Sequence, residues 1–201
     1  MGVIIDENLN WKNQIQSVCL EFSKICGILY KVRHKLTIDA LRSVYYSLCY
    51  PIIIYCLSIW GCTWPTYVKE IITTQKKLIR TITYKGKHDS TYLLFNDLKL
   101  LRFDFLLKYF CLLRVYNDVI NNSQNSKMFR VLQHSLGTRG NNVNLLCPQP
   151  RTTLYKYSIH CFAPKCWNAL PDDLKLIANL NLSKIKLKQY LFNLQNQVAI
   201  E

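Results

Sequence analysis

Residues 11–32 read WKNQIQSVCLEFSKICGILYKV. Apolar residues recur in this stretch at alternating spacings of four and three, namely Trp11, Ile15, Val18, Phe22, Ile25, Leu29 and Val32. That spacing is typical of one face of an α-helix, so we predict an amphipathic helix that buries this face. Asn10 stands at the N-cap position, and the helix would be about 22 residues, roughly 33 Å, long and end near His34.

A short apolar run, Gly2–Ile5, lies directly before this helix and carries no charge. Its β-branched residues favour an extended strand. A strand needs a neighbour for its backbone donors and acceptors, and no earlier segment of the sequence supplies one. We therefore expect the chain to be the later part of a larger protein.

Two further helices are predicted in the first half of the chain. Thr37 is placed to start a second helix that runs to Tyr50, where Pro51 would kink or restart it. Pro65 suits the first turn of a third helix. The apolar residues of that helix expected to turn inward are Val68, Ile71, Ile72, Leu78, Ile79 and Ile82.

The second half is predicted to contain two more helices. From Leu98 to Tyr116, charged residues interleave with apolar ones as expected for a helix with one buried face. A last helix would be capped near Ser183. Its apolar positions are Ile185, Leu187, Tyr190, Leu191 and Leu194.

The composition changes between these two helices. Asn121–Thr153 is rich in Asn, Ser, Gln, Gly and Pro, as in a linker or long loop. Leu154–Phe162 then resembles a short strand. We predict a helical domain over residues 1–120, a linker over 121–153 and a C-terminal segment over 154–201. The fold class is mainly α: a helical bundle preceded by one short strand, with a loop-rich linker and a small C-terminal strand-helix segment.

The charge balance favours a polyanionic partner. Lys and Arg outnumber Asp and Glu 26 to 12 in a chain of 201 residues. An excess of this kind attracts nucleic acid. The residues that we expect to contact phosphates lie on the polar side of the third helix and in the turn after it, namely Lys69, Lys76, Lys77, Arg80, Lys85 and Lys87. A merely solvated helix surface is the alternative explanation for this charge pattern.

Residues Ser43–Val68 contain no charged side chain. The stretch is long enough to span a bilayer, so a small single-span membrane protein is one alternative. Pro51 and Gly61, together with several tyrosines, make it less apolar than typical spans. A helix buried on all sides by protein explains the run equally well and gives each tyrosine hydroxyl a partner.

The sequence lacks recognisable catalytic or metal-binding patterns. The adjacent acidic pairs, Asp6-Glu7 and Asp172-Asp173, have neither the flanking strands nor the third carboxylate that a two-metal site requires. None of its four histidines has an acidic residue at a local spacing suited to orient it as a catalytic base, and Cys147, His160, Cys161 and Cys166 lack paired ligand spacing. The nine cysteines are an odd number without a signal peptide, which favours reduced thiols in an intracellular protein, cytoplasmic or nuclear. We expect no catalytic residue, metal or cofactor.

Several short motifs occur along nearly the whole chain in a fixed order. They are Gly2-Val3-Ile4-Ile5-Asp6 with Leu9, Trp11 and Ile15; Tyr45-Tyr46-Ser47-Leu48, Tyr50-Pro51, Tyr55-Cys56 and Ile59-Trp60-Gly61; Gln75-Lys76-Lys77, Arg80, Phe95, Leu98 and Leu100-Leu101; and Ala163-Pro164-Lys165, Trp167-Asn168 and Leu170-Pro171-Asp172-Asp173-Leu174. This series resembles the region after the catalytic palm in reverse transcriptases of non-long-terminal-repeat retrotransposons, the jockey-like and related LINE elements.

The resemblance implies a thumb and C-terminal region of an RNA-directed DNA polymerase. Such a region would hold an RNA-DNA or RNA duplex, through phosphate contacts and without sequence preference, beside the palm domain of the parent protein. Because this chain lacks the palm carboxylates, we expect it to be inactive as a polymerase by itself. An inert or host-adopted remnant that acts as an interaction module is the other alternative.

Overall fold

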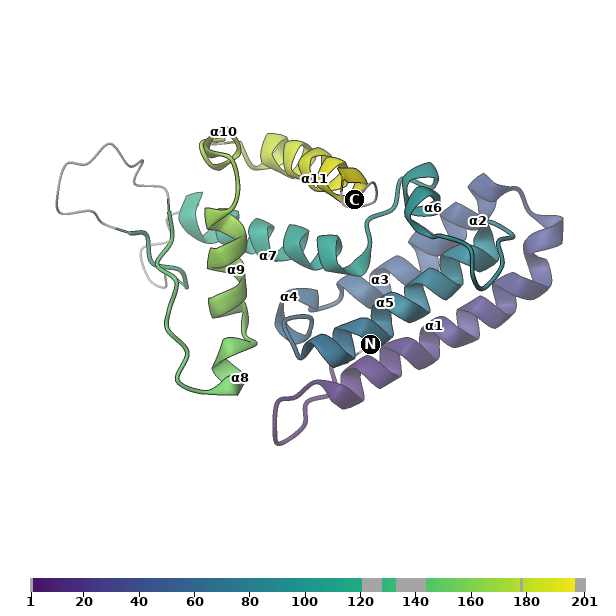
Figure 1. Cartoon of the computed structure of the whole chain (residues 1–201), viewed down its shortest axis with the longest axis horizontal. Helices are drawn as coiled ribbons and strands as arrows, with labels where there is room; N and C mark the ends of the chain where they lie inside the picture. Colours follow the sequence, from purple (N-terminus) through teal and green to yellow (C-terminus); the bar gives the residue numbers. More distant parts are fainter. Residues whose placement is uncertain (1, 121–127, 133–143, 178, 198–201) are drawn as a thin grey trace.

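The computed structural model describes residues 2–120, 128–132, 144–177 and 179–197. Within these ranges the chain is mainly α-helical, as predicted (Figure 1). The helices are α1 (Lys12–Val32), α2 (Ile38–Val44), α3 (Tyr50–Ile54), α4 (Leu57–Trp60), α5 (Pro65–Ile82), α6 (Tyr92–Asp97), α7 (Phe103–Ile120), α8 (Thr153–Lys156), α9 (Ile159–Asn168), α10 (Asp172–Lys175) and α11 (Leu180–Gln197), with a 3₁₀ turn η1 (Arg33–Lys35) and a π-helical segment η2 (Tyr45–Cys49).

The first layer of the bundle is the pair α1 and α5, which lie side by side (Figure 1). The apolar face predicted for residues 11–32 is confirmed, because Ile15, Phe22 and Leu29 are buried. The N-cap of α1 is Trp11, one residue after the predicted Asn10, and the Asn10 side chain accepts from the backbone N–H of Lys12 at 2.8 Å. Pro65 opens α5 as predicted, and the inward residues of α5 fill the space against α1.

The predicted helix from Thr37 to Tyr50 is confirmed in place but is more irregular and continues further. Thr37 accepts a hydrogen bond from the N–H of Ala40 at 3.3 Å and so caps α2. One π-helical segment, η2, then joins α2 to α3. Pro51 lies in the first turn of α3, where its missing N–H costs little. The helical path breaks only at Tyr55 and Cys56, which has a φ of 53°.

Two expected helix boundaries were wrong. The helix predicted to begin at Leu98 begins instead at Phe103, because Lys99 has a φ of 53° and turns the chain between α6 and α7. In the last helix, Asn179 rather than Ser183 supplies the N-terminal cap, since its Oδ1 accepts from the N–H of Asn181 at 2.9 Å. Ile185, expected to face inward, is 57% exposed.

The two predicted strands are not regular strands. Leu154–Phe162 forms parts of α8 and α9, and Thr152 caps α8 by accepting from the N–H of Tyr155 at 3.2 Å. Gly2–Ile5 has no regular secondary structure, and its Ile4 N–H donates to the side chain of Gln14 at 2.9 Å rather than to a strand. Among the described residues the bridge between Val131 and Leu145 is an isolated one.

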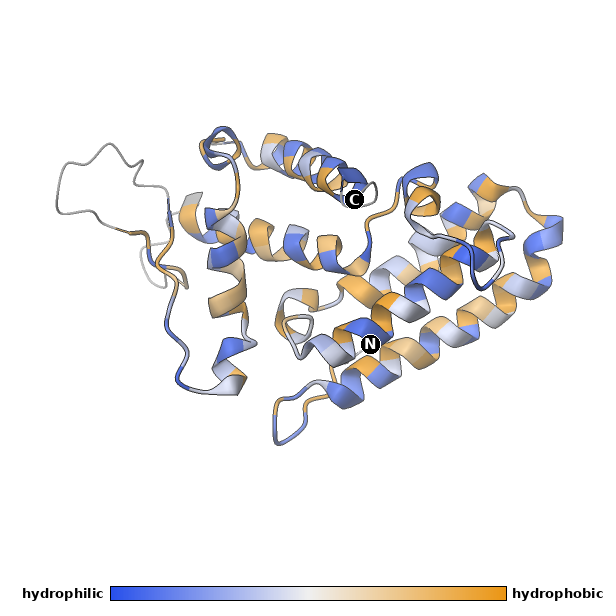
Figure 2. Cartoon of the chain, in the orientation of Figure 1, coloured by the Kyte–Doolittle hydropathy of each residue, from blue (hydrophilic) through white to orange (hydrophobic). Residues whose placement is uncertain are grey.

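Helix α7 is the centre of the second layer. Figure 2 shows hydrophobic residues along most of its length. Helix α9 crosses it, with the Tyr116 and Trp167 rings 4.8 Å apart between centroids, and α11 lies alongside it (Figure 1). The hydrophobic core is continuous from α1 to α11.

Parts of the predicted linker pack against these helices. Phe129 and Leu145 are buried, and the Asn168 side chain both donates to and accepts from the backbone of Leu145. The predicted linker residues 121–127 and 133–143 lie outside the described residues.

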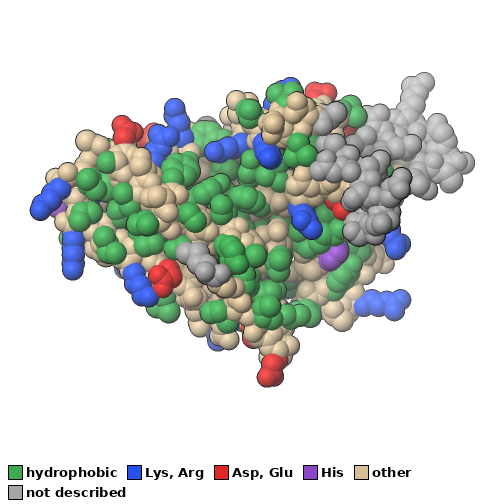
Figure 3. Space-filling model, turned by 180° about the vertical axis from the view of Figure 1, so that it is seen from behind, with side chains coloured by type: hydrophobic (Ala, Val, Ile, Leu, Met, Phe, Trp, Pro, Cys, Tyr) green, Lys and Arg blue, Asp and Glu red, His purple; other side chains and the backbone are tan. Residues whose placement is uncertain are grey.

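The uncharged stretch Ser43–Val68 is divided between core and surface. Tyr45, Ile53 and Trp60 are buried, whereas Leu48 and Ile59 are about half exposed, at 46% and 54%. Seen from behind, the molecule displays many hydrophobic side chains between scattered charges (Figure 3). No helix in the described ranges combines the length and the apolar character needed to cross a bilayer.

Candidate nucleic-acid interface

The predicted basic side chains of α5 divide between two sides of the helix. Lys69, Lys76 and Arg80 follow one another at spacings of seven and four residues, so they share one side of the helix, where Lys69 is exposed and Lys76 and Arg80 are partly buried. Lys77 is displaced by about 100° around the axis from Lys76 and points away from this stripe. We call Lys69, Lys76 and Arg80 the α5 stripe.

The turn that follows α5 carries two more of the predicted residues, Lys85 and Lys87, and both are exposed. Arg80 fixes this turn, because its Nε and Nη2 atoms donate to the carbonyl of Asp89 at 3.0 and 2.8 Å. The Asp89 carboxylate closes the turn by accepting from the Gly86 N–H at 2.7 Å. Arg80 therefore both contributes charge and positions the neighbouring lysines.

Lys76 is held by an aromatic ring. Its Nζ lies 5.7 Å from the centroid of Tyr92 in α6, and the guanidinium of Arg102 lies 5.3 Å from the same ring. Arg102 also donates to both carboxylate oxygens of Asp104, so its charge is neutralised locally. Burial opposes the charge of Arg102, but the ion pair with Asp104 leaves the pKa of Arg102 raised. Lys76 forms no ion pair with any residue in the described ranges, so its charge is available to an external anion.

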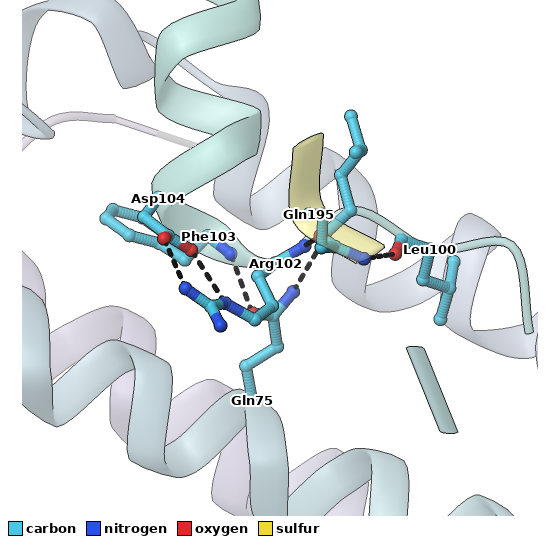
Figure 4. A network of polar contacts seen from close by, with 7 residues as sticks. Gln75, Leu100, Arg102, Phe103, Asp104 and Gln195 are labelled. Carbon is cyan, nitrogen blue, oxygen red and sulfur yellow. Dashed lines mark hydrogen bonds and ion pairs between the residues drawn. The ribbon is translucent and has the colours of Figure 1, made fainter. Parts of the chain in front are cut away.

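A buried polar residue anchors the helix that carries the stripe. Gln75, fully buried, donates from Nε2 to the hydroxyl of Tyr45 at 3.0 Å and to the carbonyl of Leu101 at 3.2 Å. Its Oε1 accepts from the N–H of Phe103 at 2.9 Å, at the first residue of α7 (Figure 4). One side chain therefore fixes α5 against α2–α3 and α7.

Gln195 in α11 also binds the backbone of the segment that leads into α7. Its Oε1 accepts from the N–H of Arg102 at 2.8 Å and its Nε2 donates to the carbonyl of Leu100 at 3.1 Å (Figure 4). The two glutamines satisfy backbone groups at the start of α7 that no intrahelical bond reaches. The sequence analysis did not predict the role of either glutamine. The available signal was a lone amide at an apolar helical position, since Gln75 is four residues after Ile71 and four before Ile79.

A cleft of about 480 Å³ lies beside Lys69, between α5, α7, α8 and α9. Three other lysines line it: Lys108, Lys156 and Lys165. Sequence reasoning did not group them, because they are separated by up to 96 residues and are brought together only by the crossing of α7 and α9.

The structure also places the acidic pairs and thiols. Asp172 begins α10 and forms an ion pair of 3.1 Å with the buried Lys175, which agrees with the predicted role in a first helical turn. The described residues contain no group of three or more His, Cys, Asp or Glu side chains suited to holding a metal. Burial raises the pKa of the Cys166 thiol to about 11, so this thiol stays protonated at neutral pH and is a weak nucleophile.

Comparison of the chain with protein-family models, with curated proteins and with solved structures finds no match.

Proposed function

We propose that this chain binds an RNA-DNA or RNA duplex through its phosphate backbone, as the thumb and C-terminal region of a LINE-type reverse transcriptase would. The observation that carries the proposal is that the α5 stripe and the basic turn after it are held together by Arg80. The α5 stripe spans about 16 Å along one rigid helix. Arg80 holds the turn bearing Lys85 and Lys87 against the end of that stripe.

The kind of contact follows from the side chains present. Lysines on a helix and a turn reach phosphates but carry no planar fork for base edges, so binding would be independent of sequence. A polymerase must grip any sequence, and the ordered motifs of this chain resemble those of such enzymes. The polymerisation chemistry would belong to a palm domain, and the module would position the duplex beside it.

Salt dependence tests this proposal directly. Each neutralised phosphate contributes about 0.9 to the slope of log affinity against log salt on a duplex. Replacing Lys76, Lys85 and Lys87 together by Gln should therefore flatten the slope for an RNA-DNA duplex by about two to three units. The slope is measured by fluorescence anisotropy at several salt concentrations.

The matched control replaces Lys12, Lys31 and Lys35 by Gln. These exposed lysines lie at the two ends of α1 and in η1, and their removal changes the net charge by the same amount. The control should retain most of the original slope. Equal flattening in both variants would show a diffuse charge effect and would contradict an interface on α5.

A further inference from the structure

Two hollows lie next to each other along the seam between α7 and α9. The first is the cleft of about 480 Å³ beside Lys69, and the second, of about 270 Å³, lies between α7, α9 and α11. Lys108, Phe162 and Lys165 line both hollows, so these three side chains form the ridge between them. We call the two hollows with this ridge the α7–α9 groove.

The floor of the groove is apolar in both hollows. Val68, Ile72 and Leu107 line the first. Leu112 and Leu194 line the second. Pockets of several hundred cubic ångströms with apolar walls take apolar groups of a ligand or partner.

The rim of the groove is positively charged. Lys69 and Lys156 lie at the first hollow, and Lys108 and Lys165 lie on the ridge. None of the four forms an ion pair with another residue in the described part of the chain. The acidic residue of the lining, Asp104, is already bound to Arg102. The groove therefore presents an uncompensated positive field around two apolar depressions.

We propose that the α7–α9 groove docks an acidic amphipathic helix of a partner protein. Apolar side chains on one face of that helix would fill the two hollows, and Asp or Glu residues beside them would meet the lysines. This is helix-in-groove recognition, in which anchors at helical spacing give affinity and charges at the rim give orientation. The groove shares Lys69 with the α5 stripe, but the proposal does not require that the stripe binds a duplex.

The chemistry of the floor favours a protein helix over a nucleic acid. An inserted base would bury polar ring edges, and a buried polar group without a hydrogen-bond partner is unfavourable. Among the polar side chains that line the first hollow, the Thr63 hydroxyl already donates to the carbonyl of Asn10 at 3.0 Å, and the Cys62 thiol lies 3.7 Å from the Cys111 thiol. Leucine or phenylalanine anchors have no such requirement.

The test uses the full chain and a fluorescein-labelled synthetic peptide of about 16 residues, long enough to form a helix. Leu and Phe occupy positions i, i+3, i+4 and i+7 of this probe, and Glu flanks them. A second peptide of the same composition has its apolar residues scrambled. We expect the patterned probe to bind at least about tenfold more tightly than the scrambled one in anisotropy titrations.

Two variants locate the binding. Lys108→Glu with Lys165→Glu reverses the charge of the ridge, and Ala169→Phe fills the second hollow from an exposed position. Each variant should bind the patterned probe about tenfold more weakly, or weaker still, than the original chain does. Lys12→Glu with Lys31→Glu is the charge-matched control and should bind the probe like the original chain. Circular dichroism verifies that all variants remain helical.

Several outcomes would overturn the proposal. They are equal binding of both peptides, equal weakening by the control variant, and unchanged binding in both groove variants. If duplex RNA displaces the probe, and if the groove variants no longer bind duplex RNA, nucleic acid is the occupant instead. The variant lacking Lys76, Lys85 and Lys87 separates this proposal from the duplex interface, because it should bind the peptide normally.

Discussion

Gln75 shows how one side chain can hold three parts of this molecule together. It lies in the buried face of α5, and its amide bonds to a tyrosine hydroxyl, a carbonyl and an N–H from three places in the chain. A buried amide is tolerated when its hydrogen bonds are made. An amide such as that of Gln75 is unfavourable on a buried apolar face unless its hydrogen bonds are made. Gln75 therefore favours the one arrangement of α5 and α7 in which they are made.

Replacing Gln75 by Leu tests this role. The substitution keeps a similar volume but leaves the N–H of Phe103 and the carbonyl of Leu101 without their partner. We expect a loss of about 2–3 kcal/mol in the free energy of unfolding, measured by urea denaturation. Gln16→Leu, at an exposed position of α1, is the matched control and should change stability by less than about 0.5 kcal/mol. Equal stability of the two variants would contradict the anchoring role.

At the scale of elements, Gly61 lies at the end of α4 in a space next to α7 that leaves no room for a side chain. A Cβ placed on Gly61 would lie 2.6 Å from the carbonyl oxygen of Leu57 and 2.7 Å from Cδ1 of Leu107. The Leu57 carbonyl belongs to α4 itself, so a side chain at Gly61 would distort the C-terminal end of this helix. It would also press on the Leu107 side chain of α7, at the wall of the first hollow.

Two glycine substitutions should have opposite signs. Gly61→Ala crowds the C-terminal end of α4 and the Leu107 side chain of α7, and we expect it to destabilise the fold by about 1–3 kcal/mol. Gly27→Ala lies in the interior of α1 with nothing within 4 Å of the added Cβ, so it should stabilise by about 0.5–1 kcal/mol. Thermal unfolding followed by circular dichroism measures both. A neutral or stabilising Gly61→Ala would show that the two helices adjust freely.

At the scale of the whole molecule, several phenols and thiols are buried in the core. Burial raises the pKa of Tyr116 from 10.0 to about 12 and that of Cys49 from 9.0 to about 12. The pKa of Cys166 is likewise raised from 9.0 to about 11. These groups are neutral in the fold at a pH where the unfolded chain has already lost their protons.

Stability should therefore fall in alkaline solution. Below pH 9 both states keep these protons, and the contribution of the groups to stability is complete. From pH 9 to about 12 the unfolded state binds fewer protons than the folded state, so the free energy of unfolding decreases with rising pH. Urea midpoints at pH 8 and pH 10.5 test the sign. A midpoint that is constant or higher at the alkaline pH would contradict the burial of these groups.

The sequence alone determined the local features of this protein. Helical spacing located α1 and the inward face of α5, because an amphipathic period is a property of neighbouring residues. Thr37 and Pro65 marked helix starts for the same local reason. The lysines of the α5 stripe were also visible as a charge pattern on one helix.

Only the tertiary structure decided features that join distant residues. The strand pattern of Leu154–Phe162 gave way to helices, because an isolated strand has no neighbour to satisfy its backbone whereas a helix satisfies its own. The break at Lys99 lies beside backbone groups that Gln75 and Gln195 bind from two other helices, α5 and α11. The lysines of the α7–α9 groove lie in four different helices. The periodicity of any one segment cannot predict that they lie close together. Sequence patterns record which face of an element is buried, whereas packing decides which faces meet.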